Sequence, residues 1–311
     1  MTAAPGWLTR GLHLGTRAAA PLFRRSFGRW DETWDRPPEQ SRVFAGALHL
    51  ELLHWPGEEP PLVTLHGLNN NAWMWARVAS LLAPRTVFSI SLRGHGGSDR
   101  PADGYDLEPT AGDVRGVLDA LGLHRVHLAG HSWGGRVALL LAGEAPERIL
   151  SLTLADPVPP GGLNPVLRRI PSLVAAAFAP ERDVFRTREE LEASARRLIY
   201  LRRGLPSDRR VWEGNYREDA GGLLRHVLPD GDFRWIAERG LARDLSWTVA
   251  RVVCPVLLLR PTFTVGFLPA EMRALRRLSR LQVRRIPGDH CFIHSNPVGT
   301  AGALEGFLGE L

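Results

Sequence analysis

Residues 130–134, Gly-His-Ser-Trp-Gly, form a G-x-S-x-G motif that could perform nucleophilic chemistry. A short apolar run ends just before the motif, and a helix-compatible segment follows it. A serine at such a sharp strand-to-helix turn is held in a strained conformation with its hydroxyl clear of the sheet. The glycines fit because a Cβ at either position would collide with the tightly packed strand and helix. The motif alone can occur by chance, but its flanking elements favour Ser132 as a nucleophile.

The elements around this motif alternate between strands and helices. We expect strands at 42–46, 47–55, 61–66, 85–91, 125–129, 149–155, 255–260 and 282–286, and helices near 73–82, 108–121, 133–145, 270–278 and 298–308. After residue 61 the strands are short apolar runs, which is the pattern of strands buried on both faces. The sequence therefore predicts an α/β fold, with a mostly parallel sheet covered by helices on both faces.

The alternation stops between Asp156 and about Arg251, in an interval that is rich in arginine and compatible with helices. We therefore predict a basic N-terminal extension (1–40), a core (41–156 and 251–311), and an inserted helical cap (157–250) above the C-terminal edge of the sheet. Apolar side chains in the predicted cap favour a hydrophobic pocket; they include Leu163, Leu167, Ile170, Phe178, Phe185, Trp212 and Tyr216.

From about residue 40 to 311 the chain resembles the α/β-hydrolase fold superfamily. The resemblance is carried by residues 66–68 (His-Gly-Leu), 93–98 (Arg-Gly-His-Gly-Gly-Ser), 130–134 and 287–290 (Pro-Gly-Asp-His). It implies a nucleophile, an acid and a histidine in that chain order, on loops at the carboxyl edge of the sheet. Members that are dehalogenases or epoxide hydrolases carry aspartate as the nucleophile, so the serine here disfavours those two activities.

The resemblance places the catalytic base at His290, in the loop after the last strand. A neutral imidazole there can take the proton of Ser132 on attack and return it to the leaving group. A lone histidine can also be a satisfied surface or core residue, and the motif is one residue shorter than the common Pro-Gly-x-Gly-His form. His294 competes for the role, but we expect it to fall where the final helix begins.

For the acid, the sequence offers alternatives. The most frequent acid position of the superfamily falls at Thr264, and a threonine cannot stabilise an imidazolium through charge. We predict Asp156 instead, because it ends the strand at 149–155 and some related haloalkane dehalogenases use an acid at that place. The alternative is that Asp156 only caps the start of the inserted segment, and we expect Asp289 to point away from the ring of His290.

The resemblance also assigns the oxyanion hole to the backbone amides of Leu68 and Trp133. His66 is expected to anchor its loop, and residues 93–96 to form a structural turn in which Ser91 replaces the usual leading aspartate. The sequence contains no metal-ligand spacing and no glycine-rich dinucleotide motif after a strand, so we expect neither a metal nor a cofactor. The chain has no lysine, which excludes Schiff-base chemistry.

Composition limits the partners. All 39 basic residues are arginines, and the formal net charge is +6. These arginines are spread along the chain without interleaved aromatic residues, so we expect no nucleic-acid partner. The arginine-containing first thirty residues could weakly contact an anionic membrane surface, although a flexible extension or a packed helix is the favoured interpretation.

The two cysteines, Cys254 and Cys291, are expected at opposite ends of the sheet. A disulfide between them would exceed the usual Cα separation, and a reduced, cytoplasmic protein fits best. No run of ~18 apolar residues is present to span a membrane.

The sequence therefore predicts a serine hydrolase that cleaves an ester, lactone or thioester of a small to medium hydrophobic acyl compound. Its catalytic residues would be Ser132, His290 and Asp156, with Leu68 and Trp133 in the oxyanion hole. Two alternatives stay open. The same residues could hydrolyse a C–C bond of a dicarbonyl compound, or the chain could be a ligand-binding or vestigial hydrolase with an incomplete triad. The oligomeric state is unknown.

Overall fold

The structure is a computed structural model that describes residues 36–162, 184–195, 206–228, 230–262, 274–278 and 280–311. Most of the predicted N-terminal extension lies outside the described residues, as does Thr264. The same holds for Leu163, Leu167, Ile170 and Phe178 of the predicted cap, and for residues 270–273 of the helix expected at 270–278. In the described ranges, no helix combines the length and the apolar character needed to cross a membrane.

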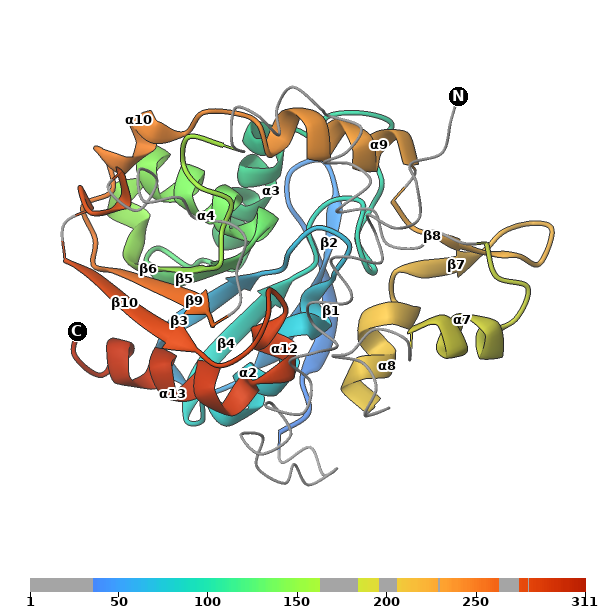
Figure 1. The fold of residues 1–311 in the computed structure, drawn as a ribbon, viewed down its shortest axis with the longest axis horizontal. Coiled ribbons are helices and arrows are strands. Elements are labelled where there is room, and N and C mark those ends of the chain that lie inside the picture. Colours follow the sequence, from blue (N-terminus) through green and yellow to red (C-terminus); the bar gives the residue numbers. More distant parts are fainter. Residues whose placement is uncertain (1–35, 163–183, 196–205, 229, 263–273, 279) are drawn as a thin grey trace.

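Eight strands form one sheet in the order β1-β2-β4-β3-β5-β6-β9-β10 (Figure 1). They are β1 (Glu39–Phe44), β2 (His49–Trp55), β3 (Glu58–Leu65), β4 (Arg85–Ile90), β5 (Val126–His131), β6 (Ile149–Ala155), β9 (Val256–Pro261) and β10 (Leu281–Ile286). Strand β2 pairs antiparallel with β1 and β4, and the remaining pairings are parallel. The predicted mostly parallel sheet is therefore confirmed.

Helices cover both faces of this sheet (Figure 1). One face carries α3 (Leu107–Ala120), α4 (Trp133–Glu144) and α10 (Ser246–Val249); the other carries α2 (Ala76–Leu81), α12 (Phe292–Ser295) and α13 (Pro297–Leu308). The short helices η1 (Ala72–Trp75) and η2 (Pro146–Arg148) precede α2 and β6. These layers confirm the fold class predicted from the sequence.

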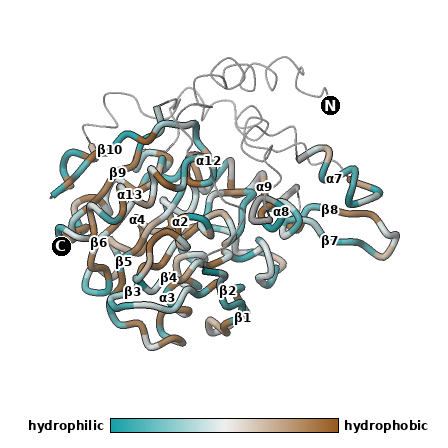
Figure 2. The backbone as a smooth tube through the Cα atoms, turned by 90° about the horizontal axis from the view of Figure 1, so that it is seen from below, coloured by the Kyte–Doolittle hydropathy of each residue, from teal (hydrophilic) through white to brown (hydrophobic). Residues whose placement is uncertain are grey.

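The apolar runs of the central strands supply two hydrophobic cores. On β3, Val63 and Leu65 pack in the core that includes α3 and α4, whereas Leu62 packs in the core that includes α2 and α13. Successive side chains of a strand point to opposite faces, so a strand between two helical layers must be apolar on both. Figure 2 shows hydrophobic residues gathered along the central strands and α4.

Several element bounds differ from the predicted ones, two of them in ways that matter for the layout of the chain. Strand β1 begins at Glu39, inside the predicted extension 1–40. The final helix predicted at 298–308 is α13, but a short helix that the sequence did not predict, α12, precedes it and ends just before Asn296. The Asn296 side chain accepts a hydrogen bond from Gly299 N and so caps α13, while Pro297 occupies the first helical position. Proline cannot donate the backbone bond that would continue the preceding helix.

The chain between the neighbouring strands β6 and β9, residues 156–255, is here called the β6–β9 insertion. It contains α7 (Arg188–Ala195), α8 (Pro206–Glu213), β7 (Tyr216–Glu218), β8 (Leu224–His226), α9 (Asp230–Trp235), the π-helix η4 (Ile236–Gly240) and α10. The β7–β8 hairpin departs from the wholly helical segment that the sequence predicts. Its turn is built by Asp219, which accepts hydrogen bonds from Gly221 N and Leu223 N, and by Gly222 at φ +78°. Such a turn interrupts a helix.

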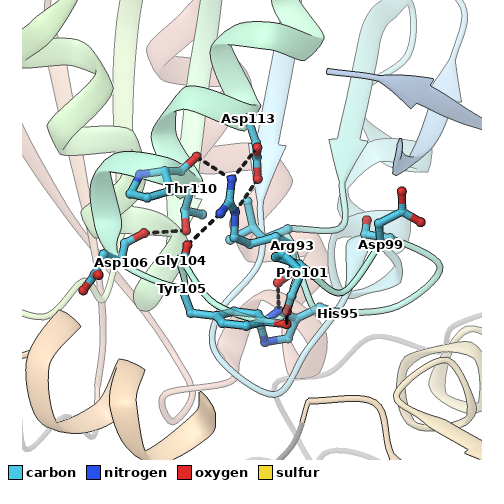
Figure 3. Close-up of polar contacts among 12 residues, drawn as sticks. Arg93, His95, Asp99, Pro101, Gly104, Tyr105, Asp106, Thr110 and Asp113 are labelled. Carbon is cyan, nitrogen blue, oxygen red and sulfur yellow. Dashed lines mark hydrogen bonds and ion pairs between the residues drawn. The ribbon is translucent and has the colours of Figure 1, made fainter. Parts of the chain in front are cut away.

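A polar network anchors the loop after β4 to α3 (Figure 3). Arg93 Nε and Nη2 each donate to the carboxylate of Asp113 at 2.6 Å, and the guanidinium also donates to Gly104 O and Pro109 O. Both side chains of the ion pair are largely buried, 11% and 6% exposed. These contacts agree with a structural role for residues 93–96.

Ser91 stands where an aspartate is usual, and a carboxylate from a neighbouring strand takes the place of the aspartate side chain. Ser91 Oγ donates to Glu51 Oε2 of β2 at 2.6 Å and accepts from Ala72 N at 2.9 Å. Glu51 Oε2 also accepts from Gly97 N at 2.9 Å. The loop after β4 is therefore tied to the sheet by a serine and a glutamate together.

Candidate active site

Ser132 stands at the turn between β5 and α4, with φ +50° and ψ −112°. A residue other than glycine is strained in this region, and such strain concentrates at functional sites. A Cβ on Gly130 would lie 2.2 Å from Gly134 O, and a Cβ on Gly134 would lie 2.4 Å from His66 O. Both motif glycines are thus required by contacts between backbones, as the sequence predicts.

The structure brings His290 and Asp156 together across 134 residues of chain. His290 Nδ1 lies 2.7 Å from Asp156 Oδ2. Asp156 directly follows β6, its amide donates to Leu259 O at 2.9 Å, and its side chain is 5% exposed. Because a carboxylate only accepts, Nδ1 carries the proton of a neutral ring, and Nε2 is left as the acceptor. This is the tautomer that a general base requires.

The other two candidates near His290 have different surroundings. His294 lies in α12, as expected for the start of the C-terminal helices, and is buried. Asp289 Oδ1 accepts from Cys291 N at 2.9 Å, so its carboxylate is engaged by the backbone of its own loop. Of the described carboxylates, Asp156 is the one hydrogen-bonded to the His290 ring.

Charges around His290 raise its pKa above the ordinary value of 6.5. Burial is the largest single effect and lowers the pKa, because it disfavours the charged ring. The hydrogen bond and negative charge of Asp156 outweigh burial, and the charge of Asp289 adds to them. The site therefore stabilises the imidazolium that forms when the ring accepts a proton.

His131, the residue before Ser132, links the turn to the histidine loop. Its Nε2 donates to the His290 carbonyl oxygen at 2.7 Å, and the two ring centroids are 4.7 Å apart. Burial, with the nearby His290, lowers the pKa of His131 well below 6.5, so His131 stays neutral. Among the described residues no hydrogen bond joins Ser132 Oγ to the His290 ring. In ligand-free enzymes such bonds are often long and shorten in the substrate complex.

The loop after β3 lies directly against Ser132. A Cβ on Gly67 would be 3.2 Å from Ser132 Cβ. The next amide, that of Leu68, and the amide of Trp133 donate no hydrogen bond within the part of the chain that the structure describes. Trp133 begins α4, and the first amides of a helix lack partners inside the helix and carry partial positive charge. Two amides without a partner among the described residues thus belong to the loop against Ser132 and to the residue after it, where an oxyanion hole would need donors.

The β6–β9 insertion contributes apolar side chains beside this site. Of the seven cap residues named from the sequence, Phe185, Trp212 and Tyr216 lie within the described ranges, and they are not among these side chains. Phe185 and Trp212 pack with Leu191 and Leu224, and Tyr216 packs against them, so this set forms a small separate core. The hydrophobic core that includes Trp133 instead contains Phe233, Ile236 and Leu241 from the insertion. A Cβ on Gly240 of η4 would lie 2.6 Å from the Trp133 ring. Sequence reasoning missed η4, because nothing local identifies a π-helix.

Two further features of the described residues, their metal-binding capacity and a groove away from Ser132, bear on the chemistry of the chain. No group of three histidine, cysteine, aspartate or glutamate side chains in the described ranges could hold a metal ion. A groove of about 980 Å³ has His127, Cys254 and Arg280 among its lining residues, near the amino ends of the strands. Burial and Arg85 lower the pKa of His127 to about 4. This groove is at the edge of the sheet opposite Ser132.

Comparisons with known proteins agree with this architecture. A family model described as the α/β-hydrolase fold matches residues 60–192. Fluoroacetate dehalogenase from Burkholderia sp. is 28% identical over 291 residues, covering 82% of this chain and 88% of that protein. The 2-(acetamidomethylene)succinate hydrolase of Mesorhizobium japonicum is 28% identical over 274 residues, covering 86% and 94%. A crystal structure of E-2-(acetamidomethylene)succinate hydrolase gives a TM-score of 0.76 at 25% identity, covering 88% of this chain and 99% of that chain.

Proposed function

Because the chain belongs to the α/β-hydrolase fold superfamily, we propose that it is a serine hydrolase. Its substrate would be an ester, lactone or thioester of a small to medium hydrophobic acyl compound, cleaved without metal or cofactor. The observation that supports this proposal most is the 2.7 Å contact between His290 Nδ1 and Asp156 Oδ2. It gives the histidine beside Ser132 the protonation pattern of a general base.

In the proposed reaction Ser132 Oγ attacks the acyl carbon while His290 Nε2 takes the hydroxyl proton. Asp156 orients the ring and stabilises its positive charge without itself being protonated. The tetrahedral intermediate collapses to an acyl-enzyme, and His290 returns the proton to the leaving alkoxide or thiolate. Water then attacks the acyl-enzyme with His290 again as the base, which releases the acid and restores Ser132.

The proposed oxyanion hole favours acyl transfer over halide displacement. Attack on a carbonyl places negative charge on its oxygen, which the amides of Leu68 and Trp133 would hold. Displacement of a halide from a saturated carbon places no charge at that position. The activity named for the dehalogenase relative is therefore not proposed for this chain.

The predicted cap is proposed to be the β6–β9 insertion, which would shape the acyl pocket. Phe233, Ile236 and Leu241 of this insertion share a core with Trp133, so the insertion packs against the residue that follows Ser132. We propose a small-molecule substrate, no nucleic-acid partner and a cytoplasmic location. The free thiols of Cys254 and Cys291 are compatible with a reducing compartment. Membrane contact by the N-terminal segment stays a prediction.

The test is covalent labelling by a fluorophosphonate, which reacts with an activated serine. We expect one label per wild-type chain, no label on Ser132→Ala, and slower labelling of Asp156→Asn. Absence of labelling on folded wild-type protein would overturn the proposal in favour of a ligand-binding module. p-Nitrophenyl esters of increasing acyl length and vinylogous diketones would then be compared as substrates. Turnover of the diketones alone would replace ester hydrolysis by C–C bond hydrolysis.

A further inference from the structure

A buried asparagine joins the loop after β3 to the β6–β9 insertion. Asn71 is fully buried. Its Nδ2 donates to Val211 O at 3.0 Å and to Arg210 O at 3.3 Å, while its Oδ1 accepts from Trp73 N at 3.1 Å. Arg210 and Val211 are in the last turn of α8, where carbonyl groups lack partners inside the helix. A residue of the core therefore caps a helix of the insertion.

A second asparagine, which belongs to the insertion, forms a hydrogen bond with the core. Asn215, which is 3% exposed, donates from Nδ2 to Asn69 O at 2.7 Å, and its Oδ1 lies 3.3 Å from Asn71 Nδ2. The backbone of Asn215 is itself fixed, because its carbonyl accepts from Val227 N at 2.7 Å. A Cβ on the preceding Gly214 would lie 2.6 Å from Asn71 Nδ2. A glycine is thus what lets the two asparagines meet.

The residue held by Asn215 belongs to the turn that carries the proposed oxyanion amide. Asn70 N donates to Gly67 O at 3.1 Å, which closes a four-residue turn with Leu68 and Asn69 at its centre. Asn69 has φ +65°. A type II turn requires a positive φ at this third position, and asparagine tolerates it better than most residues. The direction of the Leu68 amide depends on the peptide planes of this turn.

We propose that Asn215 is a positioning residue, which fixes the turn at Gly67–Asn70 and thereby aims the Leu68 amide at the oxyanion. The inference rests on the proposed function, because it needs an acyl-transfer intermediate. As a consequence, the β6–β9 insertion would not only shape the pocket but also orient a backbone amide that stabilises the negative charge of the oxyanion. The Asn215 side chain is buried and its bond to the Asn69 carbonyl oxygen is part-buried, so removal of the side chain takes a shielded donor from that oxygen.

The experiment compares Asn215→Leu with the control Arg217→Ala. Arg217 Nη2 donates to Gly96 O at 3.1 Å, so it also joins the insertion to the core, but among the described residues it forms no hydrogen bond with the turn at Gly67–Asn70. Thermal melting checks that each variant is folded. If Asn215→Leu does not fold, Asn215→Ser replaces it, because the shorter side chain cannot span the distance to Asn69 O.

Two measurements distinguish a role of Asn215 in positioning the Leu68 amide from a role in only attaching the insertion to the core. The first is kcat and KM for the best p-nitrophenyl ester. The second is inhibition by a trifluoromethyl ketone and by the matching secondary alcohol. The ketone carbon bonds to Ser132 Oγ, the hydroxyl proton passes to His290, and the ketone oxygen becomes an oxyanion. The alcohol has the same shape and forms no such bond, so the ratio of the two inhibition constants reports on the oxyanion hole.

For the Asn215 variant we expect kcat to fall about tenfold, because complete loss of one oxyanion donor costs about 10²–10³. The ketone inhibition constant should rise by a similar factor, whereas KM and the alcohol constant should change less than about twofold. Arg217→Ala should leave the ketone-to-alcohol ratio unchanged. An unchanged ratio in the Asn215 variant, or an equal change in both variants, would overturn the inference. Failure of the proposed function is recognised separately, as wild-type protein without Ser132-dependent labelling.

Discussion

Replacing Asp156 by asparagine tests whether the negative charge beside His290 supports catalysis. The change keeps the shape of the side chain and removes the charge that lies 2.7 Å from His290 Nδ1. At about 4 Å between charge centres and an effective dielectric constant of about 20, an imidazolium and a carboxylate attract by ~4 kcal/mol. Each ~1.36 kcal/mol is a factor of ten in rate. Full loss of this attraction in the transition state would therefore slow the reaction about 10³-fold.

Two corrections act on this figure in opposite directions. The His290 side chain is 43% exposed, so solvent screens part of the attraction. The amide of asparagine can also stabilise the wrong ring tautomer, which adds to the loss. We therefore expect kcat/KM of Asp156→Asn to fall by about 10³-fold, measured with the best p-nitrophenyl ester.

The pH profile supplies an independent signature of the same change. Hydrolysis needs a neutral His290, and its pKa is raised above 6.5. Wild-type kcat/KM should thus decline as the pH falls through a value above 6.5. In Asp156→Asn no carboxylate at this position offsets the effect of burial, which lowers the pKa of His290. The acid limb of the pH profile should therefore move to lower pH. The raised pKa of His290 also affects the stability of the fold. The ion pair of His290 with Asp156 stabilises the folded state below pH 6.5, and this contribution to the free energy of unfolding is lost as the pH rises through the raised pKa.

The matched control is Asp289→Asn, which removes a carboxylate hydrogen-bonded to Cys291 N instead of to the ring. It should lower kcat/KM by no more than about tenfold, because its more distant charge acts on the ring only through space. A larger loss in Asp289→Asn than in Asp156→Asn would refute the assignment of the acid. An acid limb that moves to higher pH in Asp156→Asn would refute the electrostatic reasoning.

Further predictions concern strain and packing, each measured as the free energy of unfolding in urea. Ser132→Gly should be inactive yet more stable by about 1 kcal/mol, because glycine relieves the strain of the positive φ; a loss of stability would contradict this. Gly134→Ala should cost at least about 2 kcal/mol, since its Cβ would meet backbone oxygen at 2.4 Å. Its control, Gly302→Ala in α13, has open space around the Cβ and should gain about 0.5–1 kcal/mol. Arg93→Leu should cost about 3–5 kcal/mol by leaving the buried Asp113 carboxylate without its cation, and a cost below 1 kcal/mol would exclude this account.

Sequence reasoning reached the fold because its signals are local and repeated. A strand buried between two helical layers must be apolar at every position, as β3, β5 and β9 are over most of their lengths. It was less accurate at element ends, since β1 begins earlier than predicted, and it missed the short helix α12 before the final helix. It missed the β7–β8 hairpin, whose turn depends on a single aspartate and nearby glycines within an otherwise helix-compatible stretch.

What the sequence by itself determined is the turn at Ser132. The requirements of that turn are met within five residues, because Gly130 and Gly134 admit backbone contacts that any side chain would block. Such steric conditions are the same wherever the motif sits, so they can be recognised without knowing the rest of the chain.

Only the tertiary structure decided which carboxylate faces His290. The contact with Asp156 spans 134 residues, and it exists because the parallel register of β6, β9 and β10 brings the loops after β6 and β10 to one edge of the sheet. The contact of Asn215 with Asn69 likewise depends on how the insertion returns onto the loop after β3. Hydrogen bonds of this kind are set by the packing of whole elements, and residue type and spacing do not encode them.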